Sequence, residues 1–510
     1  MVSSEASHEN RSIVKYEPNH PNPGFTSNRR RPVKDMSSYD LVVIGGGPAG
    51  LIGAAEAASF GRSVALVNAE KALGGAGVNT GTMPSKTLRE TALALSGAKS
   101  RKLYGVDLSL RREATVADFL LHEQNVKAGF NAWIAQRVAA DKIDFYSGSG
   151  VFLDAHTIVV GNTTLRGEKI LIATGSSPRR PTLFPFGQPH VYDSDTILNL
   201  DRLPRTLAVV GAGVIGCEYA CTFAALGVEV HLVDGRDVLL PFLDGEVSQA
   251  LSDAMQRNGI VFHRNERVLA CAAGNNGDRI ALKLASGGVL RTDAVLVAAG
   301  RKSNTERLNL PAAGVAIGEH GLIPVDEYYR TSAPHIYAAG DVIGFPALAS
   351  TSMEQARRAV RHALELPMGS EFPRLLPTGI YTIPEISMVG ETEESLKKQG
   401  VEYVVGRARY EDSARGRIIG DTDGFLKLLF RRADRKLVGV HMLGESATEL
   451  VHIGLMAMLG GATDAIFDEV CFNLPTLADL YKFAARDAWL RERVGGGWSL
   501  RDAEWTGASK

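Results

Sequence analysis

The sequence predicts an α/β protein with two Rossmann-like dinucleotide-binding domains and an α+β domain at the C-terminal end. The first observation is that two segments, "YDLVVIGGGPAGLIGAAEAASFGRSVALVN" and "RTLAVVGAGVIGCEYACTFAALGVEVHLVD", resemble each other. Each reads as strand, glycine turn, small-residue helix, glycine and strand, which is the pattern of a βαβ unit. The second observation is a change from residue 371 onward, where hairpin and helix-capping signals replace this pattern. With 510 residues the chain is long enough for about three domains.

Each of the two segments places three glycines between an apolar strand and a helix. They are Gly45, Gly47 and Gly50 in the first copy, and Gly211, Gly213 and Gly216 in the second. In such a motif the first glycine makes the tight turn, the second lets the backbone approach a pyrophosphate, and the third lets the helix pack on the strand. An unoccupied structural turn is the alternative, but the strand and helix on either side favour dinucleotide binding at both copies.

An acidic side chain about twenty residues after the turn normally binds the ribose 2′-hydroxyl. In the second copy this residue is Asp234, whereas the first copy has Asn68 at the end of "VALVN". Because an amide can also bond a hydroxyl, we expect Asn68 to take this role, with Glu70 as the alternative.

Three further segments read as buried strands that end in glycine at a loop: "ILIATGSSPRRP", "VLVAAGRKSNT" and "HIYAAGDVIG". Open α/β sheets bind ligands at such strand ends. We therefore expect Gly175, Gly300 and Gly340 to lie near bound cofactors.

Composition and charge exclude several functions. The formal net charge is −1, so no overall field attracts nucleic acid or acidic membranes, and small molecules are the expected partners. Four cysteines in this length argue against a disulfide framework and favour a reducing, cytoplasmic location. The longest uncharged run, between Asp40 and Glu56, is too short to span a bilayer and is broken by glycines.

These motifs resemble the two-dinucleotide flavoproteins related to dihydrolipoyl dehydrogenase and glutathione reductase, over roughly Ser37 to Lys482. The resemblance implies FAD at the first fingerprint and a nicotinamide nucleotide at the second. In that family two segments close the FAD site, which here assigns Thr174 and Gly175 from one segment, and Gly340 and Asp341 from the other, to the flavin.

The resemblance also orders the domains. Because Asp341 follows the second fingerprint, the FAD-binding domain is predicted to be discontinuous. The predicted divisions are a disordered extension (1–36), the FAD-binding domain (37–190 and 307–370), the NAD(P)-binding domain (191–306), a C-terminal dimer-interface domain (371–490) and a tail (491–510). In the interface domain, "GFLKLLF" and "LVGVHML" predict an antiparallel hairpin, and "SATE" from Ser446 predicts a capping box that opens a helix.

Disulfide members of this family carry a Cys-x-x-x-x-Cys pair in the segment "GGAGVNTGTMPSKTLRE", where this chain has Gly77 and Thr82. Neither residue can replace a low-pKa thiolate. The family's His-Glu pair near the C-terminus is replaced by Leu474 and Asp479. The thiol relay and its acid/base partners are therefore predicted to be lost, although Thr82 is still expected beside the flavin.

The hydride-transfer residues remain. By resemblance Lys86, in "PSK", lies by the flavin, and Glu218, in "GVIGCEYA", pairs with it; a purely structural ion pair is the alternative. Cys217 and Cys221 are spaced for one helix face but lack two further ligands, so we expect apolar packing and no metal site.

The segments "VNTGTMPSKTLRE", "YDSDTIL" and "PTGIYTIPEISMVG" look closest to the soluble pyridine nucleotide transhydrogenases, a thiol-poor branch of the family. The resemblance implies hydride transfer between NADPH and NAD⁺ through FAD by an Si-specific type of enzyme that forms a homodimer or a higher homo-oligomer. A single nicotinamide-type fingerprint predicts one shared nucleotide site and ping-pong kinetics, with Arg236 swinging in to pair with the 2′-phosphate of NADP(H). A diaphorase or oxidase, and a non-enzymatic nucleotide sensor, stay open as alternatives.

Overall fold

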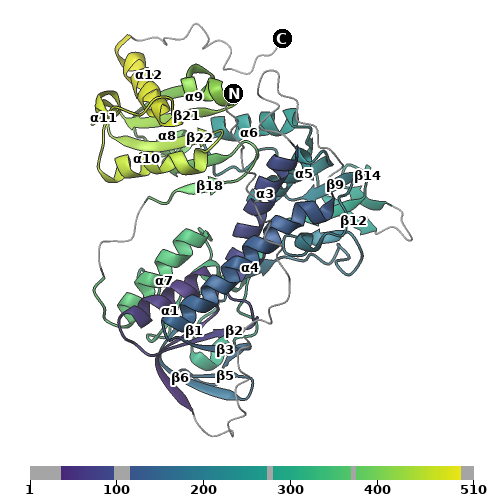
Figure 1. The fold of residues 1–510 in the computed structure, drawn as a ribbon, viewed down its shortest axis with the longest axis vertical. Coiled ribbons are helices and arrows are strands. Elements are labelled where there is room, and N and C mark those ends of the chain that lie inside the picture. Colours follow the sequence, from purple (N-terminus) through teal and green to yellow (C-terminus); the bar gives the residue numbers. More distant parts are fainter. Residues whose placement is uncertain (1–35, 97–114, 273–278, 369–374, 495–510) are drawn as a thin grey trace, which may run out of the picture.

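The computed structural model describes residues 36–96, 115–272, 279–368 and 375–494. These residues form three lobes, two of them with a parallel sheet at the centre and the third with an antiparallel sheet (Figure 1). The α/β fold class is therefore confirmed. The predicted extension before Met36, with its basic triplet Arg29 to Arg31, and the predicted tail from residue 495 onward lie outside the described residues.

The first lobe is built on a sheet with the order β3-β2-β1-β6-β5-β4, to which β17 is added beside β6. The strands are β1 (Ser37–Ile44), β2 (Val64–Asn68), β3 (Asp144–Ser147), β4 (Gly150–Phe152), β5 (Thr157–Val160), β6 (Thr163–Ile172) and β17 (Ile336–Ala338). The central strands are parallel and buried on both faces, which explains their continuous apolar sequence. Helices α1 (Pro48–Ser59) and α7 (Ala349–Ala363) pack against each other beside this sheet (Figure 1).

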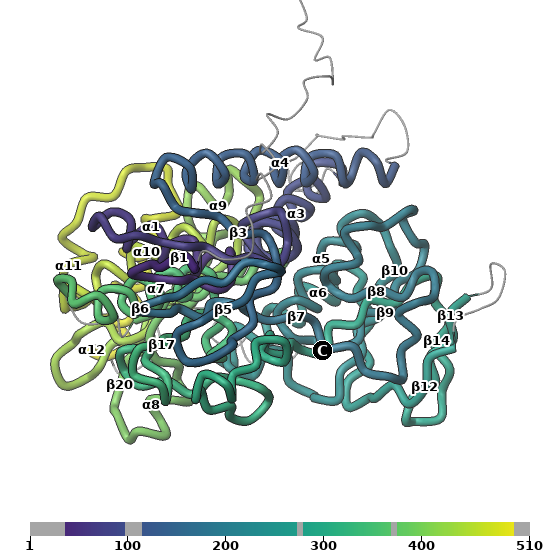
Figure 2. The backbone as a smooth tube through the Cα atoms, turned by 90° about the horizontal axis from the view of Figure 1, so that it is seen from below, coloured from purple at the N-terminus to yellow at the C-terminus, as the bar shows by residue number. Residues whose placement is uncertain are grey.

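The second lobe has a parallel sheet with the order β11-β10-β9-β15-β8, seen on the right in Figure 2. Its strands are β8 (Val191–Asp193), β9 (Thr206–Val210), β10 (Glu229–Val233), β11 (Val261–His263) and β15 (Ala294–Val297). Helices α5 (Val214–Ala225) and α6 (Gly245–Arg257) contribute to the core on one face. The antiparallel strands β12 (Val268–Ala272), β13 (Ile280–Leu284) and β14 (Val289–Thr292) form a separate sheet, and β13 packs into a second core beside β9 and β15.

Two long helices run from the first lobe to the second (Figure 1). They are α3 (Thr82–Ser96), which follows the short α2 (Gly75–Asn79), and α4 (Val116–Ala140). A two-stranded ribbon of β7 (Ser176–Pro178) and β16 (Arg301–Ser303) also connects the lobes. In the described part of the chain, no helix combines the length and apolar character needed to cross a membrane.

The third lobe contains the antiparallel sheet β18-β19-β22-β21-β20. Its strands are β18 (Thr378–Ile380), β19 (Ile386–Gly390), β20 (Tyr403–Arg409), β21 (Phe425–Arg431) and β22 (Leu437–Leu443), and its helices are α8 (Glu393–Gln399), α9 (Ala414–Ile419), α10 (Ala447–Leu459), α11 (Asp464–Glu469) and α12 (Leu480–Val494). The predicted hairpin is confirmed, because β21 and β22 pair directly. Helix α12 continues past residue 491, where the tail was expected to begin, and Glu492 in its last turn pairs with Arg435.

The predicted capping box at Ser446 is wrong. Ser446 lies in the left-handed backbone region with φ +61°, and its side chain makes no cap bond to α10. Instead Glu385, from the segment before β19, accepts hydrogen bonds from the backbone N–H and hydroxyl of Thr448 in the first turn. A distant carboxylate therefore caps this helix, which sequence spacing alone does not reveal.

Candidate functional site

A cleft of about 1290 Å³ lies at the carboxyl ends of the parallel strands in the first lobe. It is lined by the first glycine turn, the loop after β2, the start of α3 and the loops after β6 and β17. Eight of the predicted site residues line it together: Gly45, Gly47, Asn68, Thr82, Thr174, Gly175, Gly340 and Asp341. Gly50 is buried beneath the turn, and Lys86 is not part of this lining.

The two glycine turns have the same geometry. A Cβ atom at Gly50 would lie 1.7 Å from the carbonyl oxygen of Gly45, and one at Gly216 would lie 1.9 Å from that of Gly211. Only glycine permits this close approach of the helix to the turn. Helix α1 begins after Gly47 and α5 begins after Gly213, in both cases without a side-chain cap, so the first N–H groups are free to bind an anion.

Asn68 holds the first glycine turn together. Its Oδ1 accepts a hydrogen bond of 2.9 Å from the backbone N–H of Gly46, and its Nδ2 donates to the carbonyl oxygens of Glu70 and Ala72. Both amide hydrogens are thereby used within the loop. Oδ1 is therefore the acceptor that Asn68 offers to a ribose hydroxyl at this position, and Glu70 also lines the cleft.

The cleft fits a flavin dinucleotide. The Thr174 hydroxyl lines it and is buried, and it has no hydrogen-bond partner in the described structure, so it is available to a bound ligand. Nearby, the Ser176 hydroxyl donates to Asp341 at 2.7 Å and accepts from Arg301 Nε at 2.7 Å. This chain of bonds fixes the carboxylate of Asp341 at the edge of the cleft.

The junction of the three lobes is occupied by the predicted ion pair. Lys86 Nζ, on α3, donates to Glu218 Oε2, on α5, over 2.7 Å, and Glu218 is 7% exposed. The other carboxylate oxygen of Glu218 accepts from the backbone N–H of Tyr381 at 2.9 Å. The Tyr381 ring lies 5.0 Å from Lys86 Nζ, in cation–π contact. The pair therefore joins all three lobes at one point.

A second ion pair lies one turn further along α3. The buried Arg89 bonds the carboxylate of Glu385 at 3.2 Å and the carbonyl oxygen of Thr382 at 3.1 Å. Sequence reasoning missed Arg89, Glu385 and Tyr381. The segment "GIYTIPEIS" was noticed only as a resemblance, and nothing in its spacing connects it to α3 or α5.

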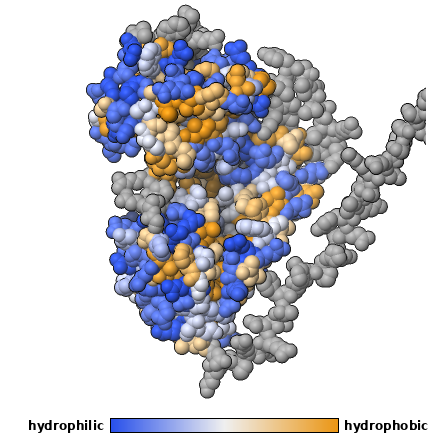
Figure 3. Space-filling view, turned by 60° about the vertical axis from the view of Figure 1, so that its left-hand side comes forward, coloured by the Kyte–Doolittle hydropathy of each residue, from blue (hydrophilic) through white to orange (hydrophobic). Residues whose placement is uncertain are grey.

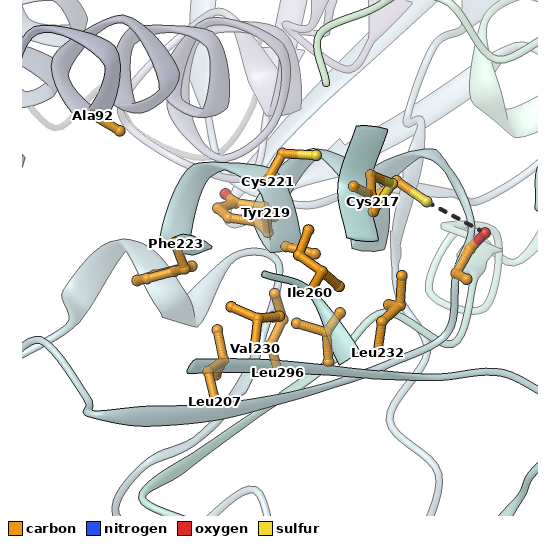
Figure 4. Packing of buried hydrophobic residues seen from close by; sticks show 14 of the residues in the cluster. Ala92, Leu207, Cys217, Tyr219, Cys221, Phe223, Val230, Leu232, Ile260 and Leu296 are labelled. Atoms are coloured by element: carbon orange, nitrogen blue, oxygen red, sulfur yellow. Dashed lines mark hydrogen bonds between the residues drawn. The ribbon is translucent and has the colours of Figure 1, made fainter. Parts of the chain in front are cut away.

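No thiol lines the cleft within the described residues. A Cβ atom at Gly77 would lie 2.7 Å from Cγ of Pro48, so a side chain there requires the proline ring to shift. Both Cys217 and Cys221 are buried on α5; the Cys217 thiol donates to the carbonyl oxygen of Ala212, whereas Cys221 lies on the side of the helix that faces away from the sheet of the second lobe (Figure 4). Burial raises the pKa of Cys221 to about 12, which keeps it protonated.

Asp234 bonds the glycine turn of the second lobe, as Asn68 bonds that of the first. Its Oδ2 accepts a hydrogen bond of 2.6 Å from the backbone N–H of Ala212. Arg236 pairs with it in a bidentate arrangement, with two N–O distances of 2.9 Å. Although burial opposes ionisation, these bonds hold the pKa of Asp234 below its usual value.

Gly300, another predicted site residue, follows β15. It has φ +93°, and its carbonyl oxygen accepts a hydrogen bond from the N–H of Arg179.

One group of carboxylates has the spacing of a metal site: Asp244, Glu246 and Glu393. The space between them holds the ammonium of Lys427, which lies 2.7 Å from Asp244 and 2.9 Å from Glu246 and is 1% exposed. The lysine ammonium and Arg407, which pairs with Glu246 at 2.9 Å, together offset most of the charge of the three acids and connect the second lobe to the third.

A cleft on one Rossmann-like lobe, joined by an ion pair to a second such lobe, defines an oxidoreductase that handles two dinucleotides. The comparisons with known proteins name the family. The chain belongs to the pyridine nucleotide-disulphide oxidoreductase family, whose model matches residues 39–363, and the dimerisation domain of that family matches residues 376–485. The predictions of FAD as cofactor and of NAD(P)H as substrates are thereby confirmed.

Several relatives are named soluble pyridine nucleotide transhydrogenase. The one from Mycobacterium bovis (strain BCG / Pasteur 1173P2) is 46% identical over 90% of this chain and 99% of its own. The one from Pseudomonas putida (strain W619) is 42% identical over 88% of this chain and 98% of its own. Among solved structures, the HOCl-induced flavoprotein disulfide reductase RclA from Escherichia coli matches with a TM-score of 0.80 and 27% identity, over 88% of this chain and 99% of that one. The predicted resemblance to the transhydrogenase branch is confirmed.

Proposed function

We propose that this protein transfers a hydride between NADPH and NAD⁺, in either direction, through bound FAD. One observation carries the proposal: helix α3 lines the cleft with Thr82 and, one turn further on, pairs through Lys86 with Glu218 of the second nucleotide-binding lobe, while Gly77 and Thr82 leave no thiol in the cleft lining as described. The relatives at 46% and 42% identity carry the name of this reaction.

FAD and the residues of the chain have different roles in the proposed reaction. FAD supplies a carrier that accepts and releases two electrons as hydride, so the protein needs no acid, base or metal of its own for the transfer. The residues of the chain bind and orient the partners. Gly45, Gly47 and the N-terminus of α1 hold the flavin pyrophosphate, and Gly211, Gly213 and the N-terminus of α5 hold that of the nicotinamide nucleotide.

Lys86 is the residue proposed to lie against the flavin. Its position is fixed from two directions, by the Glu218 carboxylate and by the Tyr381 ring. Because Glu218 is also bonded to the Tyr381 backbone, a displacement of any one of the three disturbs the others. This preorganisation keeps a positive charge in place beside the reacting ring system.

Because the protein has one lobe for a nicotinamide nucleotide, we propose that NADPH and NAD⁺ bind to the same site in turn.

We further propose a homodimer in the cytoplasm. The third lobe matches the family's dimerisation domain and exposes large apolar side chains, which Figure 3 shows as orange areas on the upper lobe. Met456, Leu459 and Leu474 are 66%, 57% and 66% exposed. Covering them requires a partner surface.

The test is an anaerobic assay of the FAD-loaded protein with NADPH as donor and a spectrally distinct NAD⁺ analogue as acceptor. The proposal expects rapid transfer between the two nucleotides and negligible reduction of lipoamide or glutathione disulfide. Rapid reduction of a quinone or of oxygen, with slow transfer to the NAD⁺ analogue, would instead identify a diaphorase or oxidase. A protein that binds nucleotides but transfers nothing would be a sensor.

A further inference from the structure

The nucleotide lobe contains a second arginine next to Asp234 that the fingerprint does not include. Arg267 lies just before β12, and its side chain passes over the loop after β10: a Cβ atom at Gly235 would be 3.4 Å from Arg267 Nε. The two loops are bonded to each other, because the N–H of Glu266 donates to the Asp234 carbonyl oxygen at 3.0 Å and the N–H of Asn265 donates to that of Arg236. Arg267 is therefore held beside the end of β10.

The two arginines at this place differ in their pairing. Arg236 is already neutralised by the bidentate bonds to Asp234. Arg267 is exposed, and no carboxylate in the described structure forms an ion pair with its guanidinium. The neighbouring Glu266 carboxylate is turned away, since its Oε1 accepts from the backbone N–H groups of Arg267, Ala285 and Ser286.

We infer that Arg267 is the residue that binds the 2′-phosphate of NADP(H), while Asp234 and its partner Arg236 serve the free ribose hydroxyls of NAD(H). This inference rests on the proposed function, and it assigns the specificity of the same site. The end of β10 is where a Rossmann-like fold places the adenosine ribose. A phosphate dianion there meets a neutral Asp234–Arg236 pair on one side and an unpaired guanidinium on the other.

The arrangement explains how one site accepts both nucleotides. With NAD(H), a ribose hydroxyl replaces one of the Arg236 side-chain bonds to the Asp234 carboxylate, whose oxygens otherwise accept from Arg236 and from the N–H of Ala212, and Arg267 remains in solvent. With NADP(H), the guanidinium of Arg267 offers the planar donor pair that matches a phosphate, so the carboxylate need not be removed. Figure 2 shows β10 and β12 together in the right-hand lobe, which puts both subsites in the same domain.

The experiment measures binding of two small probes to the FAD-loaded protein by calorimetry: adenosine 2′,5′-bisphosphate, which carries the 2′-phosphate, and 5′-AMP, which does not. Arg267→Ala is expected to weaken binding of the bisphosphate by about tenfold to a hundredfold, the loss typical of a charge-assisted hydrogen bond. Its affinity for 5′-AMP should be unchanged. Arg267→Lys should recover part of the loss. Arg291→Ala, which removes an exposed arginine from β14 in the same lobe, is the matched charge control and should change neither probe.

Three results would overturn the inference. The first is an Arg267→Ala protein that binds the bisphosphate as tightly as the parent does. The second is an equal loss for both probes. The third is a larger selective loss in Arg236→Ala than in Arg267→Ala, which would return the 2′-phosphate to Arg236. Because these are binding measurements, they decide the role of Arg267 even if hydride transfer between nucleotides is not found.

Discussion

Asn68 and Gly46 are joined by a hydrogen bond of 2.9 Å from the backbone N–H of Gly46 to the side-chain Oδ1 of Asn68, across 22 residues. The same bond recurs in the second lobe, where the N–H of Ala212 donates to Asp234 over 2.6 Å and the same separation. Asn68, which stands where the motif usually has an acidic residue, therefore keeps the acceptor that holds the glycine turn in place. The amide adds donors to Glu70 and Ala72 that a carboxylate lacks.

We predict that Asn68→Ala weakens FAD binding. The variant leaves the buried N–H of Gly46 without its acceptor, at a cost of about 1 to 3 kcal/mol, which corresponds to roughly tenfold or more in the dissociation constant. The measurement is flavin release during dialysis, followed by titration with FAD. Asn68→Asp keeps the acceptor and is the matched control, so it should lie closer to the parent. An Asn68→Ala protein that retains FAD like the parent would show that this bond is unimportant.

The Lys86–Glu218 pair should act as a unit. Lys86→Met is expected to slow reduction of the flavin by NADPH at least tenfold while the flavin stays bound, because the charge beside it is lost. The two donors bond different oxygens of Glu218, so Glu218→Gln, with one carbonyl oxygen, keeps either the bond from Lys86 or the bond from the Tyr381 N–H, and it should be milder than Glu218→Ala, which loses both.

A double-mutant cycle checks the coupling of this pair. The double variant Lys86→Met with Glu218→Ala should lose much less than the sum of the two single losses, since each single substitution already removes the interaction between Lys86 and Glu218. Strictly additive effects on the rate of flavin reduction would mean that the two residues work independently.

The buried Lys427 makes stability depend on pH. Burial opposes ionisation of Asp244, but the Lys427 ammonium holds the pKa of that carboxyl below its usual value, and Glu393 is lowered in the same way by its bond to Lys427. A lowered pKa stabilises the fold above the unfolded value, and this stabilisation is lost as the pH falls through the folded value. Urea unfolding of the parent should therefore show declining stability from about pH 5 downward.

Lys427→Met should destabilise the protein at pH 7 by about 3 to 5 kcal/mol, because the three carboxylates lose the ammonium buried among them and only Glu246 and Glu393 keep a cation, Arg407. In this variant acidification should no longer destabilise the junction, since protonation relieves the repulsion among the acids. Lys283→Met, on the exposed face of β13, is the control and should change stability by less than about 0.5 kcal/mol. A parent-like pH profile in Lys427→Met would refute the role of the ammonium.

Thiol reagents should leave hydride transfer intact. Cys471 is exposed and should react first, whereas burial raises the pKa of Cys221 and of Cys217 and protects both. Mass spectrometry follows the alkylation of Cys471 to completion. The alkylated protein should transfer hydride between nucleotides at a rate that differs from that of the parent no more than the rate of Cys471→Ser does. Strong inhibition of a protein that remains folded would reveal a catalytic thiol.

The sequence predicted those parts of the site that depend on local pattern. The glycine turns, the strands around them, the β21–β22 hairpin and the Lys86–Glu218 pair could be expected, because each is carried by a short motif or by the family resemblance. Tyr381, Arg89 and Glu385 could not, since their contacts join segments about 160 or more residues apart in chain order, such as Tyr381 and Glu218 with a separation of 163. Long-range pairing of this kind leaves no periodic signal in a single sequence.

One prediction failed because of a tertiary contact. The capping box at Ser446 is wrong because the carboxylate of Glu385, rather than a local side chain, satisfies the start of α10. The role of Arg236 as the phosphate ligand stays a prediction. The sequence shows neither its bidentate bonds to Asp234 nor the position of Arg267 over Gly235, and both bear on that role.

In the proposed reaction, FAD carries a hydride between two nucleotides that bind to one site in turn. The most direct test separates the two visits: the protein is bleached anaerobically with one equivalent of NADPH, freed of nucleotide on a desalting column, and then mixed with NAD⁺ in a stopped-flow instrument. We expect the flavin absorbance to return at a rate at least as fast as steady-state turnover, with one NADH formed per flavin. A flavin that stays bleached with NAD⁺ but recolours with oxygen or a quinone would contradict this expectation.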